Sequence, residues 1–479
     1  MNKRRLLYVA AEISPYASAG GLGEVGRSFP KSLNEYEDYD ISRVMPCHKS
    51  IAAGMSYLMD YPVAMEQGFD TCVVKSEISE GIRTYFITSD RYFYRDNIYG
   101  YEDDGVRFYF FCKAVQELIR RLPEPPEIVH ANDWHTGLLP LMLKKEFPQI
   151  KTVYTVHNIS YQGYVPAAYL AGQLTMKEQY SLGWPEWLNF MKAGILYSDL
   201  LTTVSPGYCE ELQKPELGCG MTPLLQQRKH PMIGILNGIE VQCYDPGAAG
   251  DLEYPYDREH PELKKQNRSW LRRHYGLPED DRPLIAMITR LDYSKGIDVL
   301  LKAISFFDFS KFQLMLLGTG NSYYQDILRG ITTGYPESIA ADFQYSPDKA
   351  KRIYAGADIY LMPSLYEPCG LGQLYAMRYG AVPVVHPVGG LKDTVWDGEL
   401  HPDYPNGFYM REWSGQALKE ALNRALAIYG TPDWNRYVKN CMSFDSSWCR
   451  STREYRKYYE KLFSGEDEKA EQEVNTNFH

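Results

Sequence analysis

The sequence lacks any apolar run long enough to cross a membrane and any cluster of basic residues. Basic residues at 3–5 precede the apolar stretch Leu6–Ala11, but this stretch ends at Glu12 and is too short for an export signal. No window of about 18 apolar residues occurs later in the chain. Acidic residues outnumber basic ones by 61 to 51, giving a formal charge of −10, which disfavours nucleic-acid binding. We therefore expect a cytoplasmic protein that binds neither a membrane nor a nucleic acid.

Cysteine pairs of the CxxC type are also missing, although the chain has nine cysteines. Their odd number and wide spacing in a long chain argue against a disulfide framework and against a zinc site. The histidine-rich segments described below lack the spacing of a metal centre as well. We expect reduced thiols and no bound metal. The cysteines are Cys47, Cys72, Cys112, Cys209, Cys219, Cys243, Cys369, Cys441 and Cys449.

The composition that remains is that of a large globular protein with many tyrosines. A chain of 479 residues implies at least two domains. Hydrophobic residues at 44% and charged residues at 23% exclude a disordered or fibrous chain. The 40 tyrosines supply flat rings with a polar edge, on which sugars stack, although most of them should simply fill the core. The composition favours an enzyme.

Short apolar runs alternate with amphipathic stretches in two successive series, which predicts two parallel sheets wrapped by helices. A polar segment rich in Pro, Gly and charge, Tyr244–Arg272, separates the two series, and we place the domain boundary near residue 245. The expected fold class is α/β, with two doubly wound domains facing a deep cleft that is the natural ligand site. The predicted strands are Leu6–Ala11, Glu127–Ala131, Thr152–Val156 and Leu200–Val204, then Leu284–Ile288, Phe312–Leu317, Ile359–Met362 and Val382–Val385. The predicted helices include Arg107–Leu122, Gly137–Glu146, Gly296–Phe306 and Pro347–Ala355.

The end of the chain divides into two parts. Ser451–Phe463 is dense in Tyr, Lys and Arg and predicts a helix. Residues 464–479 are acidic and offer almost nothing to bury, so we expect a solvated, disordered tail there.

Polar motifs follow the predicted strands of the first series. Ala17–Val25 contains a glycine turn between a strand and a helix, where a ligand can approach the backbone and the positive end of the helix. His130–His135 and Thr155–Gly163 each follow a strand, and α/β sheets bind their ligands at the carboxyl ends of strands. A glycine turn or a lone histidine is usually structural, but two polar clusters at neighbouring strand ends favour a site.

The second series repeats this arrangement with cations. Thr289–Gly296 places an Arg and a Lys five residues apart before a helix, and Gly318–Gly320 ends the next strand, which favours a diphosphate site over a surface salt bridge. Pro363–Tyr375 combines a glutamate, a proline and a glycine turn with a following helix, so that a carboxylate and backbone N–H groups lie side by side. Val388–Thr394 is a second glycine turn that leads into a helix.

Taken together, these motifs make the chain resemble the bacterial-type glycogen and starch synthases of glycosyltransferase family five, from about Leu6 to about Phe463. The resemblance also rests on Leu-Asn-Gly-Ile at 236–239, and the Pro-Ser-x-x-Glu-Pro-Cys-Gly-Leu-x-Gln-Leu-Tyr motif is highly specific. It implies the two-domain GT-B fold, with residues 1–245 on the glucan side and 246–450 on the nucleotide-sugar side. It also implies that 451–463 crosses back onto the first domain.

The resemblance further implies retaining transfer of glucose from a sugar nucleotide, usually ADP-glucose, to the non-reducing end of an α-1,4-glucan such as glycogen, with no separate cofactor. The catalytic residues would be Glu367, His157, Arg290 and Lys295. The donor would contact Gly20, Gly21, Asn237, Gly318, Tyr345, Cys369, Gly370 and Leu371. The sugar and acceptor side would include Asp133, His135 and Asn158.

Two positions depart from the family pattern. Ser18 stands where the family carries a lysine that approaches the donor phosphates, and Glu24 stands where it carries an aspartate. The loss of one cation leaves three outcomes open: weaker donor binding, a different nucleotide preference, or a paralogue with little activity. The alternative functions are therefore a related transferase that uses UDP-glucose or another acceptor, and a glucan-binding protein without catalysis. A phosphorylase fits less well, because it needs a pyridoxal phosphate lysine and a far longer chain.

Overall fold

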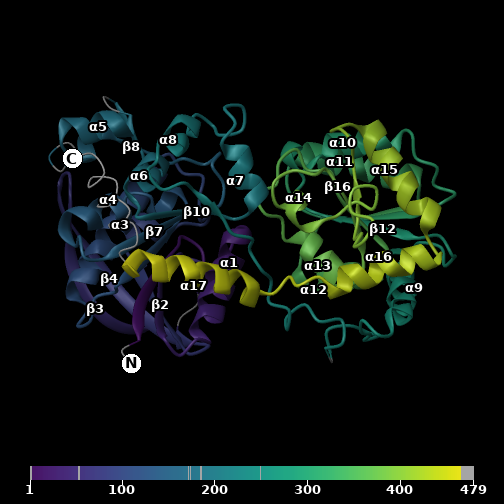
Figure 1. Cartoon of the computed structure of the whole chain (residues 1–479), viewed down its shortest axis with the longest axis horizontal. Helices are drawn as coiled ribbons and strands as arrows, with labels where there is room; N and C mark the ends of the chain where they lie inside the picture. The colour runs from purple at the N-terminus through teal and green to yellow at the C-terminus, as the bar shows by residue number, and fades with distance from the viewer. Residues whose placement is uncertain are drawn as a thin grey trace, which may run out of the picture. The chain divides into compact units, whose positions relative to one another are not determined.

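The computed structural model describes residues 3–51, 54–170, 172, 174–183, 186–248 and 250–464 (Figure 1). The chain divides into two compact units, unit 1 comprising Met1–Asn237 with Trp448–His479 and unit 2 comprising Gly238–Ser447. The division thus comes a few residues before position 245, and the segment after Ser447 belongs to unit 1. The expected acidic tail, apart from Ser464, lies outside the described residues.

Unit 1 is built on one nine-stranded sheet with the order β11-β10-β7-β6-β1-β2-β5-β4-β3. The strands from β11 to β5 are parallel, whereas β4 pairs antiparallel with both β5 and β3. The central strand β6 is buried along its whole length, as expected of a parallel strand covered on both faces. The bounds are β1 Arg4–Val9, β2 Tyr39–Pro46, β3 Ser56–Met65, β4 Gly68–Ser79, β5 Ile82–Thr88, β6 Ile128–Asn132, β7 Lys151–Val156, β10 Leu200–Thr203 and β11 Ile233–Gly234.

Helices connect these strands, and a small antiparallel ribbon of β8 and β9 stands apart from the sheet. The helices of unit 1 that precede unit 2 are α1 Gly21–Asn34, α2 Asp90–Phe93, α3 Asp104–Arg121, α4 Leu139–Glu146, α5 Met176–Leu182, α6 Phe190–Tyr197, α7 Pro206–Leu212 and α8 Thr222–Gln226. The ribbon strands are β8 Tyr164–Pro166 and β9 Trp187–Asn189, and single 3₁₀ turns lie at η1 Trp134–Thr136 and η2 Ala167–Leu170.

The C-terminal helix α17, Trp448–Ser464, packs on α1 of unit 1 (Figure 1). Its aromatic residues Trp448 and Tyr455 are buried on one face, with ring centroids 5.8 and 4.7 Å from that of Phe29 in α1. Tyr459 hydrogen-bonds Nδ1 of His130 across 2.7 Å. Trp448, Tyr455 and Tyr459 follow one another at intervals of seven and four residues, which places them on one face of the helix. This face explains why a segment so rich in tyrosine forms an ordered helix.

Unit 2 contains a six-stranded parallel sheet with the order β14-β13-β12-β15-β16-β17. The strands are β12 Leu284–Ile288, β13 Gln313–Leu317, β14 Ile339–Asp342, β15 Ile359–Met362, β16 Val382–Val385 and β17 Phe408–Tyr409. The helical elements are η3 Pro261–Leu263, α9 Lys264–Tyr275, η4 Tyr293–Lys295, α10 Ile297–Ile304, α11 Ser322–Gly334, α12 Pro347–Gly356, α13 Gly372–Arg378, α14 Gly390–Thr394, α15 Gly415–Ile428 and α16 Pro432–Ser443.

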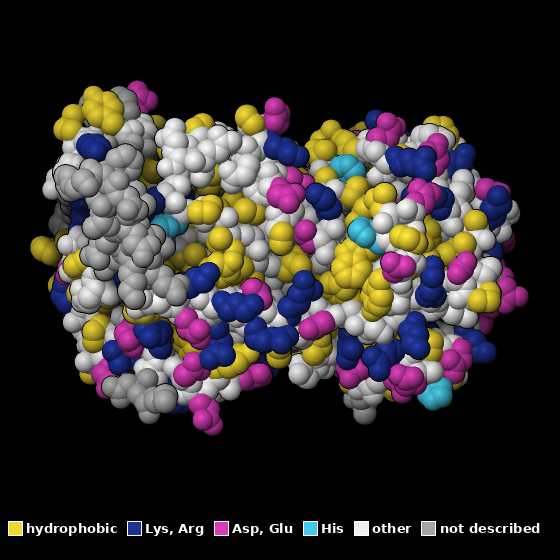
Figure 2. Space-filling model, in the orientation of Figure 1, with side chains coloured by type: hydrophobic (Ala, Val, Ile, Leu, Met, Phe, Trp, Pro, Cys, Tyr) yellow, Lys and Arg dark blue, Asp and Glu magenta, His cyan; other side chains and the backbone are white. Residues whose placement is uncertain are grey.

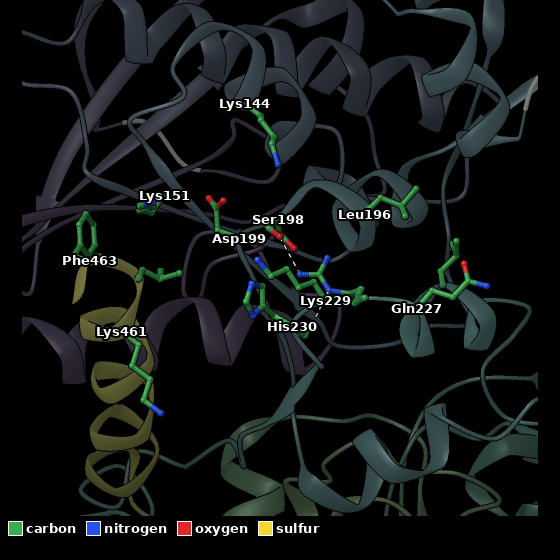
Figure 3. A pocket seen from close by; sticks show the side chains of 13 residues that line it. Lys144, Lys151, Leu196, Ser198, Asp199, Gln227, Lys229, His230, Lys461 and Phe463 are labelled. Carbon is green, nitrogen blue, oxygen red and sulfur yellow. Dashed lines mark hydrogen bonds between the residues drawn. The ribbon is translucent and has the colours of Figure 1, made fainter. Parts of the chain in front are cut away.

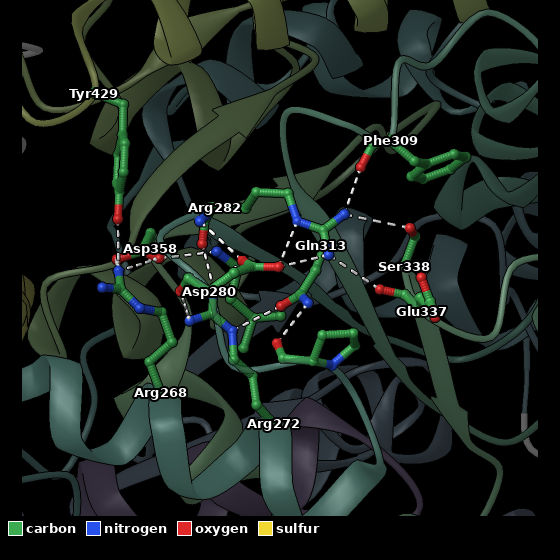
Figure 4. A network of polar contacts seen from close by, with 12 residues as sticks. Arg268, Arg272, Asp280, Arg282, Phe309, Gln313, Glu337, Ser338, Asp358 and Tyr429 are labelled. Atoms are coloured by element: carbon green, nitrogen blue, oxygen red, sulfur yellow. Dashed lines mark hydrogen bonds and ion pairs between the residues drawn. The ribbon is translucent and has the colours of Figure 1, made fainter.

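A charged network joins α9 to the amino ends of the unit 2 strands (Figure 4). Arg268 of α9 donates from Nη1 to both carboxylate oxygens of Asp358, at 2.7 and 2.8 Å. Asp358 also accepts the backbone N–H of Leu284 at 2.8 Å, so one carboxylate ties the start of β12 to the residue before β15. Arg272 donates from Nε to Gln313 at 2.7 Å. The network stabilises the fold. It lies at the amino ends of the strands, whereas the candidate site described below lies at their carboxyl ends.

All eight strands predicted from the sequence are present, with ends shifted by at most two residues, and the α/β fold class is confirmed. The parallel strands β2, β5, β11, β14 and β17, the antiparallel extension β3–β4 and the ribbon β8–β9 were not predicted. Figure 2 shows Lys and Arg side chains beside Asp and Glu side chains over both units, on the face that it displays.

Candidate active site

A lysine–glutamate pair lies at the carboxyl end of the unit 2 sheet. Gly296, after β12, has a φ of 77°, and a Cβ at this position would lie 1.9 Å from the carbonyl oxygen of Pro363, after β15. This close approach brings the two loops together, with Lys295 Nζ 2.7 Å from Glu367 Oε2. The two side chains are only 19% and 10% exposed. Ser364 Oγ donates to the same carboxylate oxygen at 3.1 Å.

A second glycine turn fixes the backbone around this glutamate. Gly389 has a φ of 45°, and a Cβ there would lie 2.1 Å from the carbonyl oxygen of Glu367. A Cβ on Gly390 would lie 2.2 Å from the carbonyl oxygen of Cys369, and the N–H of Gly390 donates to Glu367 O at 3.1 Å. Any side chain at these two positions would push the glutamate segment away, so both glycines are required for packing.

The segment after Glu367 forms the entry to α13. Cys369 is buried, Gly370 has a φ of 72°, and Leu371 is the N-cap residue of the helix. Gln373 of α13 donates from Nε2 to the carbonyl oxygens of Cys369 and Gly370, at 3.2 and 2.9 Å. The predicted donor-contacting residues of this motif are therefore held in one turn beside the lysine–glutamate pair.

The other predicted donor residues of unit 2 lie at neighbouring strand ends. Arg290 follows β12 and is 62% exposed, with Nη2 3.8 Å from an oxygen of Asp292. Gly318 follows β13, and a Cβ there would lie 2.0 Å from the carbonyl oxygen of Thr289. Tyr345 lies between β14 and α12 and is 54% exposed. Arg290 and Tyr345 are accessible, whereas Gly318 is needed for packing between two loops.

In unit 1, an aspartate organises the ends of β6 and β7. Asp133 follows β6 and has a φ of 56°, and its Oδ1 accepts the backbone N–H groups of His157 and Asn158 at 2.8 and 3.2 Å. Asn132 Oδ1 lies 2.9 Å from Nε2 of the His157 ring. Burial raises the pKa of the Asp133 carboxyl to about 7 and lowers the pKa of His157 to about 3. Asn132 lies within the predicted motif but was not among the predicted site residues.

Two further histidines of this region are buried and differ in their contacts. His135 stacks on Tyr99 with ring centroids 4.7 Å apart, and burial holds its pKa well below the ordinary value. His130 lies between Thr155 Oγ1, 2.6 Å from Nε2, and Tyr459 of α17. Burial lowers the pKa of His130 to about 3. His130 is a structural histidine, whereas His135 lies beside the Asp133 turn.

The glycine turn before α1 is held by the carboxylate of Glu12, which was not among the predicted site residues. Glu12 Oε2 accepts the N–H groups of Ala19 and Gly20, at 2.5 and 3.1 Å. Tyr99 OH donates to the other oxygen of Glu12 at 2.6 Å. Gly21 is the first residue of α1. Gly20, one of the residues expected to contact the donor, therefore has its N–H bonded to Glu12 in this structure.

The remaining positions of interest in unit 1 are Ser18, Glu24 and Asn237. Ser18 is exposed, and its hydroxyl donates to the carbonyl oxygen of Gly20 at 3.1 Å. Glu24 accepts the hydroxyl of Ser14 at 2.7 Å. Asn237 is buried and is the last residue of unit 1 before the chain enters unit 2. The predicted residues thus form two groups, one in each unit.

Within the part of the chain that the structure describes, no group of three or more His, Cys, Asp or Glu side chains is arranged to hold a metal ion. Nor does any helix in the described ranges have the length and hydropathy needed to span a membrane.

Comparison with known proteins identifies the family. Residues 5–227 match the family described as starch synthase catalytic domain, and residues 271–440 match glycosyl transferases group 1. The glycogen synthase of Moorella thermoacetica is 40% identical to this chain, over 96% of this chain and 97% of that protein. The chain belongs to the glycogen synthase family. A second family member, from Desulforudis audaxviator, is also 40% identical over 95% of this chain and 96% of its own.

The solved structures agree with this family assignment. The catalytic domain of Starch Synthase IV from Arabidopsis thaliana, bound to ADP and acarbose, is 29% identical, with a TM-score of 0.89 over 96% of this chain and 99% of that one. This glycogen synthase family member is therefore a glycosyltransferase with the two-domain GT-B architecture. The resemblance drawn from the sequence motifs is confirmed.

Proposed function

We propose that this enzyme transfers glucose from ADP-glucose to the non-reducing end of an α-1,4-glucan, with retention of the anomeric configuration. The observation that carries the proposal is the ion pair of the half-buried Lys295 and the buried Glu367, set between glycine turns at the carboxyl end of the unit 2 sheet. The relatives named glycogen synthase and the ADP and acarbose of the Arabidopsis structure support the same donor and acceptor classes.

The unit 2 residues act on the donor in this proposal. Breaking the bond between glucose and diphosphate develops negative charge on the leaving oxygen, and fixed cations stabilise that charge in the transition state. Arg290 and Lys295 supply these cations. Lys295 and Ser364 both donate to Oε2 of Glu367, so Oε1 is the oxygen that would accept the hydroxyls of the donor glucose. The N–H groups of the turn at Cys369–Leu371 would complete the site.

The unit 1 residues act on the sugar. The glucosyl group gains positive charge as the donor bond breaks, and the carbonyl oxygen of His157 would stabilise it. Asp133 binds the N–H of the same residue, which fixes the orientation of that peptide before the substrate arrives. Asp133 and His135 would line the acceptor side, with Asn158 next to them. Water must be excluded, or the donor would be hydrolysed.

A second candidate function follows from Ser18. A family member without the lysine has one cation fewer for the donor phosphates, which favours a weaker enzyme, a UDP-glucose enzyme or a glucan-binding protein without turnover. The cellular location proposed is the cytoplasm, because all nine cysteines are free thiols.

The deciding experiment is incorporation of radiolabelled glucose from ADP-glucose into glycogen, with UDP-glucose as the second donor. We expect ADP-glucose to be preferred and Glu367→Ala to lower kcat by ~10² or more. Glu420→Ala, at an exposed glutamate of α15, is the matched control and should leave the rate unchanged. Glycogen binding without turnover of either donor would refute the proposal and support the binding protein.

A further inference from the structure

A pocket of about 790 Å³ opens at the edge of the unit 1 sheet opposite the candidate active site (Figure 3). Lys151, the first residue of β7, lines it, whereas His157 follows the last residue of the same strand. At ~3.3 Å per residue, the strand separates the two by roughly 20 Å. The other lining residues come from α4, the end of α6 and the turn after it, α8 with the segment after it, and the last turn of α17. A volume of this size suits a small organic ligand.

Four lysines line the pocket (Figure 3). Lys229 lies in the segment after α8, and the other three come from three different elements: Lys144 of α4, Lys151 of β7 and Lys461 of α17. None of the three has a carboxylate within ion-pair distance among the described residues, although Lys461 lies 5.4 Å from the centroid of the Tyr458 ring. Lysine ammonium groups are mobile point charges that adapt to phosphate oxygens.

The plain structural explanation for cations here is that they neutralise helix C-termini, since several helices end at this edge. Arg228 performs that role: it donates to the carbonyl oxygen of Ile195 in α6 and, at 3.0 Å, to that of Ser198 just beyond the helix. Lys144 and Lys461 also lie in last helical turns. Lys151 begins a strand and has no helix C-terminus to neutralise. Neutralisation of helix ends therefore does not explain all the lysines of the pocket.

The pocket also contains groups that suit the organic part of a ligand. Asp199 uses Oδ2 to accept the N–H and hydroxyl of Thr152, at 2.7 and 2.9 Å, and its Oδ1 accepts no hydrogen bond from the residues that the structure describes. The hydroxyl of Ser198 is buried without a partner among the described residues. Leu462 and Phe463 provide apolar surface, and the Phe463 ring is 38% exposed. The guanidinium of Arg4 lies 3.7 Å from the centroid of that ring.

We infer that this pocket binds a small phosphorylated, polyhydroxylated metabolite, with its phosphate on Lys144, Lys151 and Lys461. The hydroxyls of the ligand meet Asp199 and Ser198, and its carbon skeleton lies against Leu462 and Phe463. The site is separate from the proposed reaction, and binding alone tests it.

The test is isothermal titration calorimetry of the full chain with glucose 1-phosphate, inorganic phosphate and glucose. We expect glucose 1-phosphate to bind more tightly than inorganic phosphate and uncharged glucose not to bind. The double variant Lys144→Gln/Lys151→Gln should weaken binding of glucose 1-phosphate at least tenfold. Removal of two exposed lysines of unit 2 by Lys265→Gln/Lys439→Gln is the matched control, and it should change the affinity less than twofold.

Glucose 1-phosphate could also occupy the donor site, so a second arm removes that site. In Lys295→Met the binding should persist, because the pocket in unit 1 is unchanged. Equal affinity in the double lysine variant and the unaltered chain would overturn the proposal. Loss of binding in Lys295→Met would overturn it as well, because the ligand would then lie in unit 2.

Discussion

The substitution Asp133→Asn should make unit 1 more stable at pH 8 while it lowers activity. Burial raises the pKa of the Asp133 carboxyl from its ordinary value of 3.8 to about 7, so the folded protein favours the protonated form. Protonation of Asp133 stabilises the folded state fully below pH 3.8. This stabilisation falls as the pH rises from about 4 to about 7, and it is lost above pH 7. At ~1.36 kcal/mol per unit of pKa, the ionised carboxylate lowers the free energy of unfolding by about 4 kcal/mol at pH 8.

Asparagine keeps the geometry that the loop needs. Its side-chain oxygen accepts the N–H groups of His157 and Asn158 as the carboxylate does, and asparagine tolerates the φ of 56° at this position. The variant therefore removes the charge without removing the acceptor. In the proposed mechanism Asp133 orients the His157 peptide through a charge-assisted hydrogen bond, and asparagine makes this bond a weaker neutral one, so we expect kcat to fall.

The assay is differential scanning calorimetry of both proteins at pH 4 and pH 8. At pH 8 the free energy of unfolding of the variant should exceed that of the unaltered protein by up to about 4 kcal/mol, which corresponds to roughly 8–16 °C in Tm for a unit of this size. At pH 4 the two proteins should differ little. Asp40→Asn, at an exposed aspartate of β2, is the control and should shift neither value. A variant that is less stable at pH 8, or a difference that does not depend on pH, would refute the reasoning.

Three further predictions test other parts of the structure. Ser18→Lys restores an exposed cation worth ~1 kcal/mol and should lower the KM for ADP-glucose roughly fivefold in steady-state kinetics; an unchanged or higher KM contradicts it. Glu12→Gln turns two charge-assisted hydrogen bonds to the glycine turn into neutral ones, so kcat/KM should fall roughly tenfold, and wild-type kinetics would argue against this role. Burial lowers the pKa of Lys264 to about 7, so unit 2 should gain stability as the pH rises from 7 towards 10. Lys264→Met should remove that gain in urea unfolding at pH 7 and pH 9, and a slope that survives in the variant would contradict the assignment.

Eight strands of the two sheets were predictable because they are short apolar runs, whereas the parallel strands β2, β5, β11, β14 and β17 were missed. The antiparallel extension was missed because β3 and β4 have only one buried face. In β4, Cys72, Val74 and Ser76 are buried while the residues between them are partly exposed. That alternation is the sequence signal of a strand with a solvated side, but it contains no apolar run.

The motifs predicted candidate site residues, but they could not predict the contacts that hold those residues in place. A glycine-rich motif predicts a turn, but not which carbonyl oxygen the turn approaches. Gly296 meets Pro363, and Gly389 meets Glu367, so each glycine joins loops that are distant in the sequence. Glu12 gave only a weak signal, an acidic residue just after a buried first strand. Its partners became clear only when the strand and the glycine turn were folded together.

The contacts of the glycine turn decide what the absence of the family lysine means. The turn keeps its shape because the carboxylate of Glu12 binds the N–H groups of Ala19 and Gly20, and because Ser18 itself bonds the carbonyl oxygen of Gly20. None of these bonds requires a lysine, so serine at position 18 removes positive charge and leaves the fold of the loop intact. The effect should therefore fall on the affinity for an anionic donor, and the residues proposed for bond breaking remain in place.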